Sequence, residues 1–276
     1  ISSAAQNGFL RLTQLLLDLY DNNKERSSTD SEDSFDYSAI VHFGSLSIFK
    51  LFVKYIDKSN LQQALLHAID INSTIIIQYI FDNLDKFDFT INDEDFISSA
   101  LKRSIKRKLV FNFLLDIFKK INPDLFKADL SKLSFFTNLL NQACLDSSLP
   151  ATEIITDIIL KEKPNYDFTK AFLNACNSKS TNICQYFLDK KVFIDFNDSS
   201  NISGLGTIDV EIFEKIINNV DQSLRFLYFE CIGSAIRNKN MKLIKYIFIL
   251  LILYIFFALG EMIASFYESN YPNASM

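Results

Sequence analysis

Residues 4–18 read AAQNGFLRLTQLLLD, and the same arrangement of residue types returns at other places along the chain. Each copy has a polar or turn-prone residue at its fifth position and an apolar triplet close to its end. Four further segments overlay this template without gaps: residues 40–54 (IVHFGSLSIFKLFVK), 68–82 (AIDINSTIIIQYIFD), 175–189 (ACNSKSTNICQYFLD) and 235–249 (AIRNKNMKLIKYIFI). Self-similarity of this kind is the signature of a repeat architecture. The sequence therefore predicts a chain built from repeated units.

The length of a unit follows from the polar residue that stands before each apolar triplet. This residue falls at Gln14, Lys50, Gln78, Asn112, Asp157, Gln185, Glu214 and Lys245. The span from 14 to 245 is 231 residues over seven intervals, so the mean period is 33, while single intervals run from 28 to 45. The unit boundaries around Asn112, Asp157 and Glu214 stay open, because the sequence shows no clear first helix for the units of Asn112 and Glu214.

Each unit is expected to form two short helices joined by a turn. A small pair such as Ala4-Ala5 opens the first helix. Gly8, Gly44 or Asn72 then ends it, because Gly and Asn adopt a left-handed backbone easily.

The second helix of a unit carries an apolar stripe. In the first unit Leu12, Leu15 and Leu16 have the i, i+3, i+4 spacing that places side chains on one helix face. One helix pair cannot bury this stripe alone, so neighbouring pairs must stack. We therefore predict an all-α solenoid of about eight stacked helix pairs over residues 1–250.

Another recurring element lies between the helix pairs. It is an apolar-Asp-apolar triplet, found as Phe35-Asp36-Tyr37, Phe87-Asp88-Phe89, Tyr166-Asp167-Phe168 and Ile194-Asp195-Phe196. With the Ala-Ala-x-x-Gly-x-Leu of residues 4–10 and the Leu-Leu-Leu of residues 15–17, these triplets make most of residues 1–250 resemble a divergent ankyrin-repeat protein. The resemblance implies hairpin loops between consecutive repeats and an extended surface that binds other proteins.

The chain departs from the ankyrin pattern in two respects. The Thr-Pro-Leu-His opening of ankyrin repeats is absent, and Lys179 and Lys239 stand at the turn position where the family prefers Gly. A tetratricopeptide array has a similar period, but its Trp, Gly-Tyr and Pro signature is missing. Ankyrin-like repeats are therefore the preferred prediction.

Composition excludes several classes of protein. Apolar residues make up 49% of the chain, which is too much for disorder, and 6 Gly and 4 Pro are too few for an all-β protein. The net charge of -5 gives no attraction to nucleic acid. The 4 cysteines form no disulfide framework, which fits a reducing compartment, and we expect a cytoplasmic protein. Because the sequence starts at Ile1 without Met, we also expect a fragment or an upstream truncation.

No catalytic constellation is visible in the sequence. His42 and His67 fall within the first helices of different units, where packing explains them. The cysteines, which are Cys144, Cys176, Cys184 and Cys231, are expected to be small buried core residues. Gly204-Leu205-Gly206 lacks the third glycine of a nucleotide-binding fingerprint, and Asp88 and Asp167 read as turn-formers and helix caps. We predict no catalytic, cofactor-binding or metal-ligating residues and no cofactor, and hence no enzyme.

Two polar segments each have two interpretations. Residues 21–36 (DNNKERSSTDSEDSFD) read as an acidic insertion between the first two units, in which Thr29 and Ser31 are candidates for acid-directed phosphorylation. Arg103, Lys106, Arg107 and Lys108 form a dense basic cluster. The cluster is either a solvated helix face or a contact for an acidic partner.

The hydrophobic segment of residues 246–266 ends the patterned part of the chain, before a tail of residues 267–276. Tyr246 to Gly260 contain no charged residue, and with Met262 to Phe266 the segment reaches a length that can span a membrane. Lys239, Lys242 and Lys245 would then be cytoplasmic. A hydrophobic capping helix is the preferred prediction, because a span from Tyr246 would pull the last apolar stripe from its neighbours.

The leading functional prediction is a monomeric protein-protein interaction scaffold of ankyrin-like repeats without catalytic activity, whose protein partner the sequence does not identify. Two alternatives stay open. One is an adaptor that is membrane-associated through residues 246–266, and the other is an accessory region of a larger enzyme truncated at its N-terminus.

Overall fold

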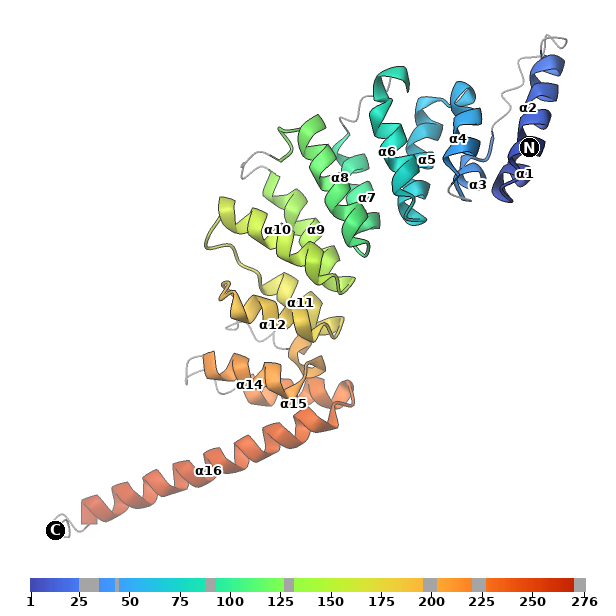
Figure 1. Ribbon diagram of the computed structural model, residues 1–276. Coiled ribbons are helices and arrows are strands. Elements are labelled where there is room, and N and C mark those ends of the chain that lie inside the picture. Colours follow the sequence, from blue (N-terminus) through green and yellow to red (C-terminus); the bar gives the residue numbers. More distant parts are fainter. Residues whose placement is uncertain are drawn as a thin grey trace. The chain divides into compact units, whose positions relative to one another are not determined.

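The computed structural model describes residues 1–24, 35–42, 45–87, 93–126, 132–195, 203–219 and 227–270. These residues form helices and contain no strand, which confirms the prediction of an all-α chain (Figure 1). The chain divides into two compact units, Ile1–Phe135 and Phe136–Met276. Each unit has its own apolar core, with Phe49 and Phe111 buried in the first and Phe172 and Phe213 in the second.

In the first unit, short helices pack as successive pairs. The helices are α1 (Ser2–Gln6), α2 (Leu10–Lys24), α3 (Tyr37–His42), α4 (Leu46–Phe52), α5 (Lys58–Asp70), α6 (Thr74–Asp82), α7 (Glu94–Ser104) and α8 (Lys108–Ile121), with the 3-10 helices η1 (Val53–Tyr55) and η2 (Leu84–Phe87). Each odd-numbered helix contacts the even-numbered helix that follows it. In addition, α1, α3, α5 and α7 contact one another in that order, as do α2, α4 and α6. Each pair is thus in contact with the next pair along the chain.

The second unit continues the same scheme. After α9 (Leu133–Leu145), in which the division between the units falls, it contains α10 (Leu149–Glu162), α11 (Thr169–Asn177), α12 (Thr181–Asp189), η4 (Ser203–Thr207), α14 (Val210–Asn219), α15 (Leu227–Arg237) and α16 (Met241–Asn270). One series of contacts runs through α10, α12, α14 and α16, and the other through α11, η4 and α15. A 3-10 helix therefore stands where the scheme has a first helix.

The turn inside a helix pair has the same geometry at five described places. At Gly8, Asn72, Ser147, Lys179 and Lys239 the backbone is left-handed, with φ of 78°, 61°, 57°, 58° and 55°. The residue after each of them donates its N–H to the carbonyl of an alanine five positions back, at 2.9 or 3.0 Å; these alanines are Ala4, Ala68, Ala143, Ala175 and Ala235. This is a Schellman turn, which ends a helix by satisfying its last carbonyls. The left-handed turns predicted at Gly8 and Asn72 are confirmed, and Gly44 lies outside the described residues.

The small residues of the template lie at the end of the first helix, so the prediction that they open it is wrong. Helix α5 begins at Lys58, ten residues before Ala68, and Ala175 lies in the last turn of α11. Both alanines are fully buried. A small side chain is suited to this place for two reasons. The backbone carbonyl of the residue must accept the hydrogen bond of the turn, and the neighbouring helix pair packs closely against the same residue.

The buried stripe of the second helices differs from the predicted one in α2. In α6 the buried residues are Ile76, Ile77 and Ile80. In α2, however, Leu12 and Leu15 are 47% and 61% exposed, whereas Thr13 and Leu17 are buried. Because the stretch from Leu10 to Leu19 is apolar on several faces, its periodicity does not identify the face that meets α4.

The unit that contains Asn112 does have a first helix, contrary to expectation. Helix α7 precedes α8, and the side chain of Asp93 caps α7 by accepting a hydrogen bond from the N–H of Asp95 at 2.9 Å. Helix α7 was not predicted because the turn from α7 into α8 has no left-handed residue and so lacks the Gly or Asn signal of the other turns. At this turn the hydroxyl of Ser104 donates to the carbonyl of Leu101 at 2.8 Å. Before Glu214, η4 replaces a regular first helix.

Two aspartates of the apolar-Asp-apolar triplets, Asp36 and Asp167, accept hydrogen bonds from the backbone at the start of the helices that follow them. The Asp36 carboxylate accepts hydrogen bonds from the backbone of Ser38 and Ala39 at the start of α3, and the bond from the Ser38 hydroxyl does most to lower the pKa of Asp36. Asp167 accepts from the N–H of Thr169 at 2.9 Å. The predicted role of Asp167 is thus confirmed, while Asp88 lies outside the described residues.

Polar contacts between neighbouring helix pairs join residues about one predicted period apart. Separations of 33 or 34 positions occur between Asp21 and Lys54, Asp21 and Tyr55, Asp70 and Arg103, Asn141 and Asn174, Cys144 and Ser178, Ser147 and Ser180, and Gly206 and Asn240. Other polar contacts join residues 28 positions apart, as between Thr181 and Asp209, and 38 positions apart, as between Glu94 and Lys132. The separations therefore scatter around the mean period of 33 counted from the sequence.

Helix α16 extends beyond both limits of the predicted hydrophobic segment. It runs from Met241 to Asn270 without interruption and includes the first residues of the expected tail. By length and composition, its part from Met241 to Phe266 can cross a membrane. Within that part, only 6% of an apolar stretch of 18 residues is buried.

Candidate interaction surfaces

The basic cluster at the junction of α7 and α8 is divided between two environments. Arg103 forms an ion pair of 2.5 Å with the Asp70 carboxylate at the end of α5, and Arg107 donates to the carbonyl of Asp70. Lys106 and Lys108 are exposed. The two arginines therefore hold two neighbouring helix pairs together, and Lys108 presents its charge to solvent.

A shallow groove of about 390 Å³ lies across the second helices of the first unit. It is lined by Leu46 of α4, by Thr74, Ile75, Gln78, Tyr79 and Asp82 of α6, and by Phe113 of α8. Ile75 is 60% exposed, and Lys50 lies 5.0 Å from the centre of the Tyr79 ring. The Gln78 amide donates to Asp82 at 2.6 Å, so the polar part of the lining is already paired. An apolar floor with a polar edge suits a side chain of a protein partner.

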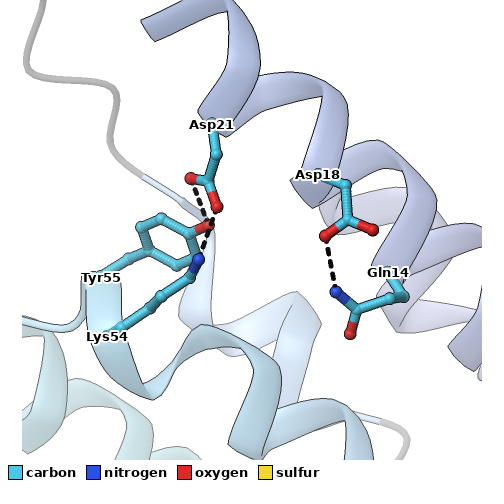
Figure 2. A network of polar contacts seen from close by, with 5 residues as sticks. All are labelled: Gln14, Asp18, Asp21, Lys54 and Tyr55. Atoms are coloured by element: carbon cyan, nitrogen blue, oxygen red, sulfur yellow. Dashed lines mark hydrogen bonds and ion pairs between the residues drawn. The ribbon is translucent and has the colours of Figure 1, made fainter. Parts of the chain in front are cut away.

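Polar contacts also join α2 to η1 in the first unit. Figure 2 shows Asp21 of α2 accepting from the Lys54 ammonium at 2.5 Å and from the Tyr55 hydroxyl at 2.6 Å. The Asp21 carboxylate raises the pKa of Lys54, while burial is the main cause of a raised pKa at Tyr55. Residues 21–24, the start of the predicted acidic insertion, thus belong to α2, and Asp21 binds the next helix pair.

The two histidines stack on each other between adjacent first helices. The rings of His42 in α3 and His67 in α5 are 6.0 Å apart and nearly parallel, at 27°. Burial lowers the pKa of His67, and its Nε2 is buried without a hydrogen-bond partner. The neutral ring is therefore favoured, and packing accounts for both histidines as the sequence indicates.

A small cavity in the second unit contains a pair of buried thiols. It has a volume of about 130 Å³ and is lined by residues of α11, α12, η4 and α14, among them Cys176, Lys179, Cys184 and Asp209. The Sγ atoms of Cys176 and Cys184 are 3.7 Å apart, and both residues are buried free thiols. Burial raises the pKa of Cys176 well above its usual value. The Cys176 thiol is therefore protonated and a poor nucleophile.

The described residues offer little chemistry beyond packing. No group of three or more His, Cys, Asp or Glu side chains among them lies close enough to hold a metal ion. Thr29 and Ser31, the candidate phosphorylation sites, lie outside the described residues. Asp70 was not predicted as the partner of the basic cluster, although it stands 33 positions before Arg103, which is the mean period counted from the sequence.

Comparison with known proteins adds no relative, since no protein-family model, curated protein or solved structure matches the chain.

Proposed function

We propose that the chain is a non-enzymatic scaffold of divergent ankyrin-like repeats that binds another protein in the cytoplasm. The observation that carries the proposal is the turn geometry: five described helix pairs end their first helix with the same Schellman turn, on an alanine carbonyl and a left-handed residue. Within each unit, helix pairs that share one geometry and contact their neighbours in order behave as a quasi-one-dimensional stack. Such a stack keeps its core when exposed residues change, and this property suits a binding surface.

Three further features support the proposal. Polar contacts recur at separations of 33 or 34 positions, which is the length of an ankyrin repeat. The Phe168 N–H donates to the Phe193 carbonyl at 3.0 Å, so successive loops before and after a helix pair meet, as hairpin loops of ankyrin type would. The buried cysteines are free, which fits a reducing compartment.

The groove on α4, α6 and α8 is the proposed contact for a side chain of the partner. It combines the exposed Ile75 with Phe113 and the Tyr79 ring, and aromatic residues in a desolvated pocket are typical of interface centres. The exposed Lys108 extends the surface with positive charge, which suits an acidic segment of the same partner.

The test begins with the full chain as bait in a native lysate and continues with the purified partner. We expect one protein to bind the purified chain stoichiometrically in isothermal titration. Ile75→Asp should weaken its binding at least tenfold, because it places a charge in the apolar groove.

Leu109→Asp is the matched control. Leu109 takes the same second position in α8 that Ile75 takes in α6, it is 78% exposed, and it does not line the groove. Its binding constant should stay within about twofold of the wild type, as expected for exposed sites outside the contact. If none of the captured proteins binds the purified chain, the scaffold function is contradicted. If the two substitutions weaken binding equally, the groove is not the contact site.

A separate pair of variants tests the basic cluster. Lys108→Glu should slow association of an acidic partner, whereas Lys120→Glu, at the other end of α8, should not. The arginines are left intact because they bind Asp70, so that a folding defect does not imitate a loss of binding.

A further inference from the structure

We propose that residues Phe248 to Phe266 of α16 cross a lipid bilayer. The packed helices of the second unit then lie on the same side of the bilayer as Lys239, Lys242 and Lys245, which stand before the span. This inference goes beyond the scaffold function, which concerns the other helices.

The first observation is a sharp change in burial along α16. Leu243 and Ile247 are fully buried, in the part of the helix that packs on α14 and α15. The next residue, Phe248, is 52% exposed, and every large apolar residue from Ile252 to Phe266 is exposed as well. A span that starts at Phe248 leaves Leu243 and Ile247 in the core. The objection that a span from Tyr246 would pull the last stripe from its neighbours does not apply to it.

The second observation is that the exposed part of α16 is apolar on all sides. Six consecutive residues, Ile252 to Phe257, are each at least half exposed, and six residues make about one and a half helical turns. A helix that binds in a protein groove has one apolar face and one polar face. Between Phe248 and Phe266 the only charged residue is Glu261. The surrounding medium must therefore be apolar in every direction, and a bilayer meets this requirement.

Length and charge agree with a span. Phe248 to Phe266 is nineteen residues, which at 1.5 Å per residue is about 28 Å, close to the roughly 30 Å of a hydrocarbon core. Glu261 lies five residues from Phe266, about 8 Å from the far end of the span, where a carboxyl group is tolerated better than at the centre. Lys239, Lys242 and Lys245 precede the span and are exposed. By the positive-inside rule, they place the second unit on the cytoplasmic side.

The experiment uses the full chain translated in the presence of ER-derived microsomes, with a polar C-terminal extension that carries a glycosylation acceptor. We expect the chain to stay with the membranes after extraction with sodium carbonate and to be glycosylated on the extension. Phe256→Arg with Phe257→Arg should lower the ratio of membrane-bound to soluble chain at least tenfold, because both residues lie at the middle of the span, eight and nine residues from its Phe248 end.

The matched control is Leu15→Arg with Leu109→Arg, which replaces two apolar residues outside α16 that are 61% and 78% exposed. It should remain membrane-bound and glycosylated like the wild type. Release of the wild-type chain by carbonate overturns the proposal. Soluble oligomers of the released chain would then indicate that α16 is covered by other copies of the chain and not by lipid. A carbonate-resistant chain with an unglycosylated extension that proteases can reach overturns the crossing, because the helix would then lie along the membrane surface.

Discussion

Gly206 of η4 lies against the backbone of Ser234 in α15 so closely that a Cβ atom on Gly206 would stand 2.4 Å from the Ser234 carbonyl carbon. The contact explains why a glycine occurs in Gly204-Leu205-Gly206, which is part of the packing between η4 and α15. Gly206→Ala should destabilise the chain by about 3 kcal/mol in urea unfolding, because backbone atoms have to move apart.

Gly233→Ala provides the contrast within α15. A Cβ atom on Gly233 would meet only the flexible end of Arg237, at 3.8 Å. Since alanine favours a helix over glycine, this change should stabilise the chain by up to about 1 kcal/mol. Equal destabilisation by the two substitutions would show that the close approach of η4 to α15 is not the cause.

The lysines at the left-handed turns should be suboptimal for stability. Lys179 and Lys239 have φ of 58° and 55°, where a side chain with a Cβ atom is strained. Lys179→Gly and Lys239→Gly should each raise the free energy of unfolding by about 1 kcal/mol, measured by urea denaturation. The control is Lys170→Gly in helix α11, which should lower it by a similar amount. A loss of stability in both turn variants would contradict the strain.

Tyr37 should make stability fall at alkaline pH. It is 4% exposed, its hydroxyl donates to the Tyr55 carbonyl at 2.8 Å, and burial raises its pKa to about 12. The folded-state pKa is above the usual value of 10, so the stabilisation is complete below pH 10 and is lost as pH rises toward 12. Wild type should exceed Tyr37→Phe in unfolding free energy by about 1 kcal/mol at pH 8. The difference should shrink between pH 10 and 12; a constant difference would exclude titration of Tyr37.

The thiols should report unfolding of the second unit. Cys144, Cys176, Cys184 and Cys231 are all buried and free, and burial raises the pKa of Cys144 to about 12. We expect a thiol reagent at pH 8 to label none of them in the native chain and all 4 after denaturation, as measured by intact mass. Rapid labelling of Cys176 or Cys184 in the native chain would mean that the cavity beside them is open to the reagent.

The left-handed turns at Gly8 and Asn72 were the predictable part of this fold, because they depend on residues close together in sequence. Gly8 and Asn72 signalled left-handed turns by residue type, whereas Ser147, Lys179 and Lys239 adopt the same φ although their side chains disfavour it. In these turns, the two backbone hydrogen bonds and the buried alanine outweigh local preference. A pattern of residue types reflects only the local preference of each residue. For this reason Lys179 and Lys239 looked like exceptions to the glycine expected at the turn.

The buried faces and the partners across pairs were harder to predict. The leucines of α2 are apolar on several faces, and only the contact with α4 determines that Thr13 and Leu17 are buried while Leu15 is not. The contact between Asp70 and Arg103 depends equally on how two pairs pack. Charge patterning within residues 103–108 indicated a surface cluster and gave no sign that its arginines are already bound.

The uninterrupted course of α16 has a mechanical consequence. The residues that anchor it in the second unit, Leu243 and Ile247, belong to the same rigid rod as the exposed apolar part, with no loop between them. If that part is fixed in a membrane, any tilt of the rod is transmitted directly to the helices that hold Leu243 and Ile247. The second unit would then have a fixed orientation relative to the membrane. A flexible linker in place of the continuous helix would leave that orientation free.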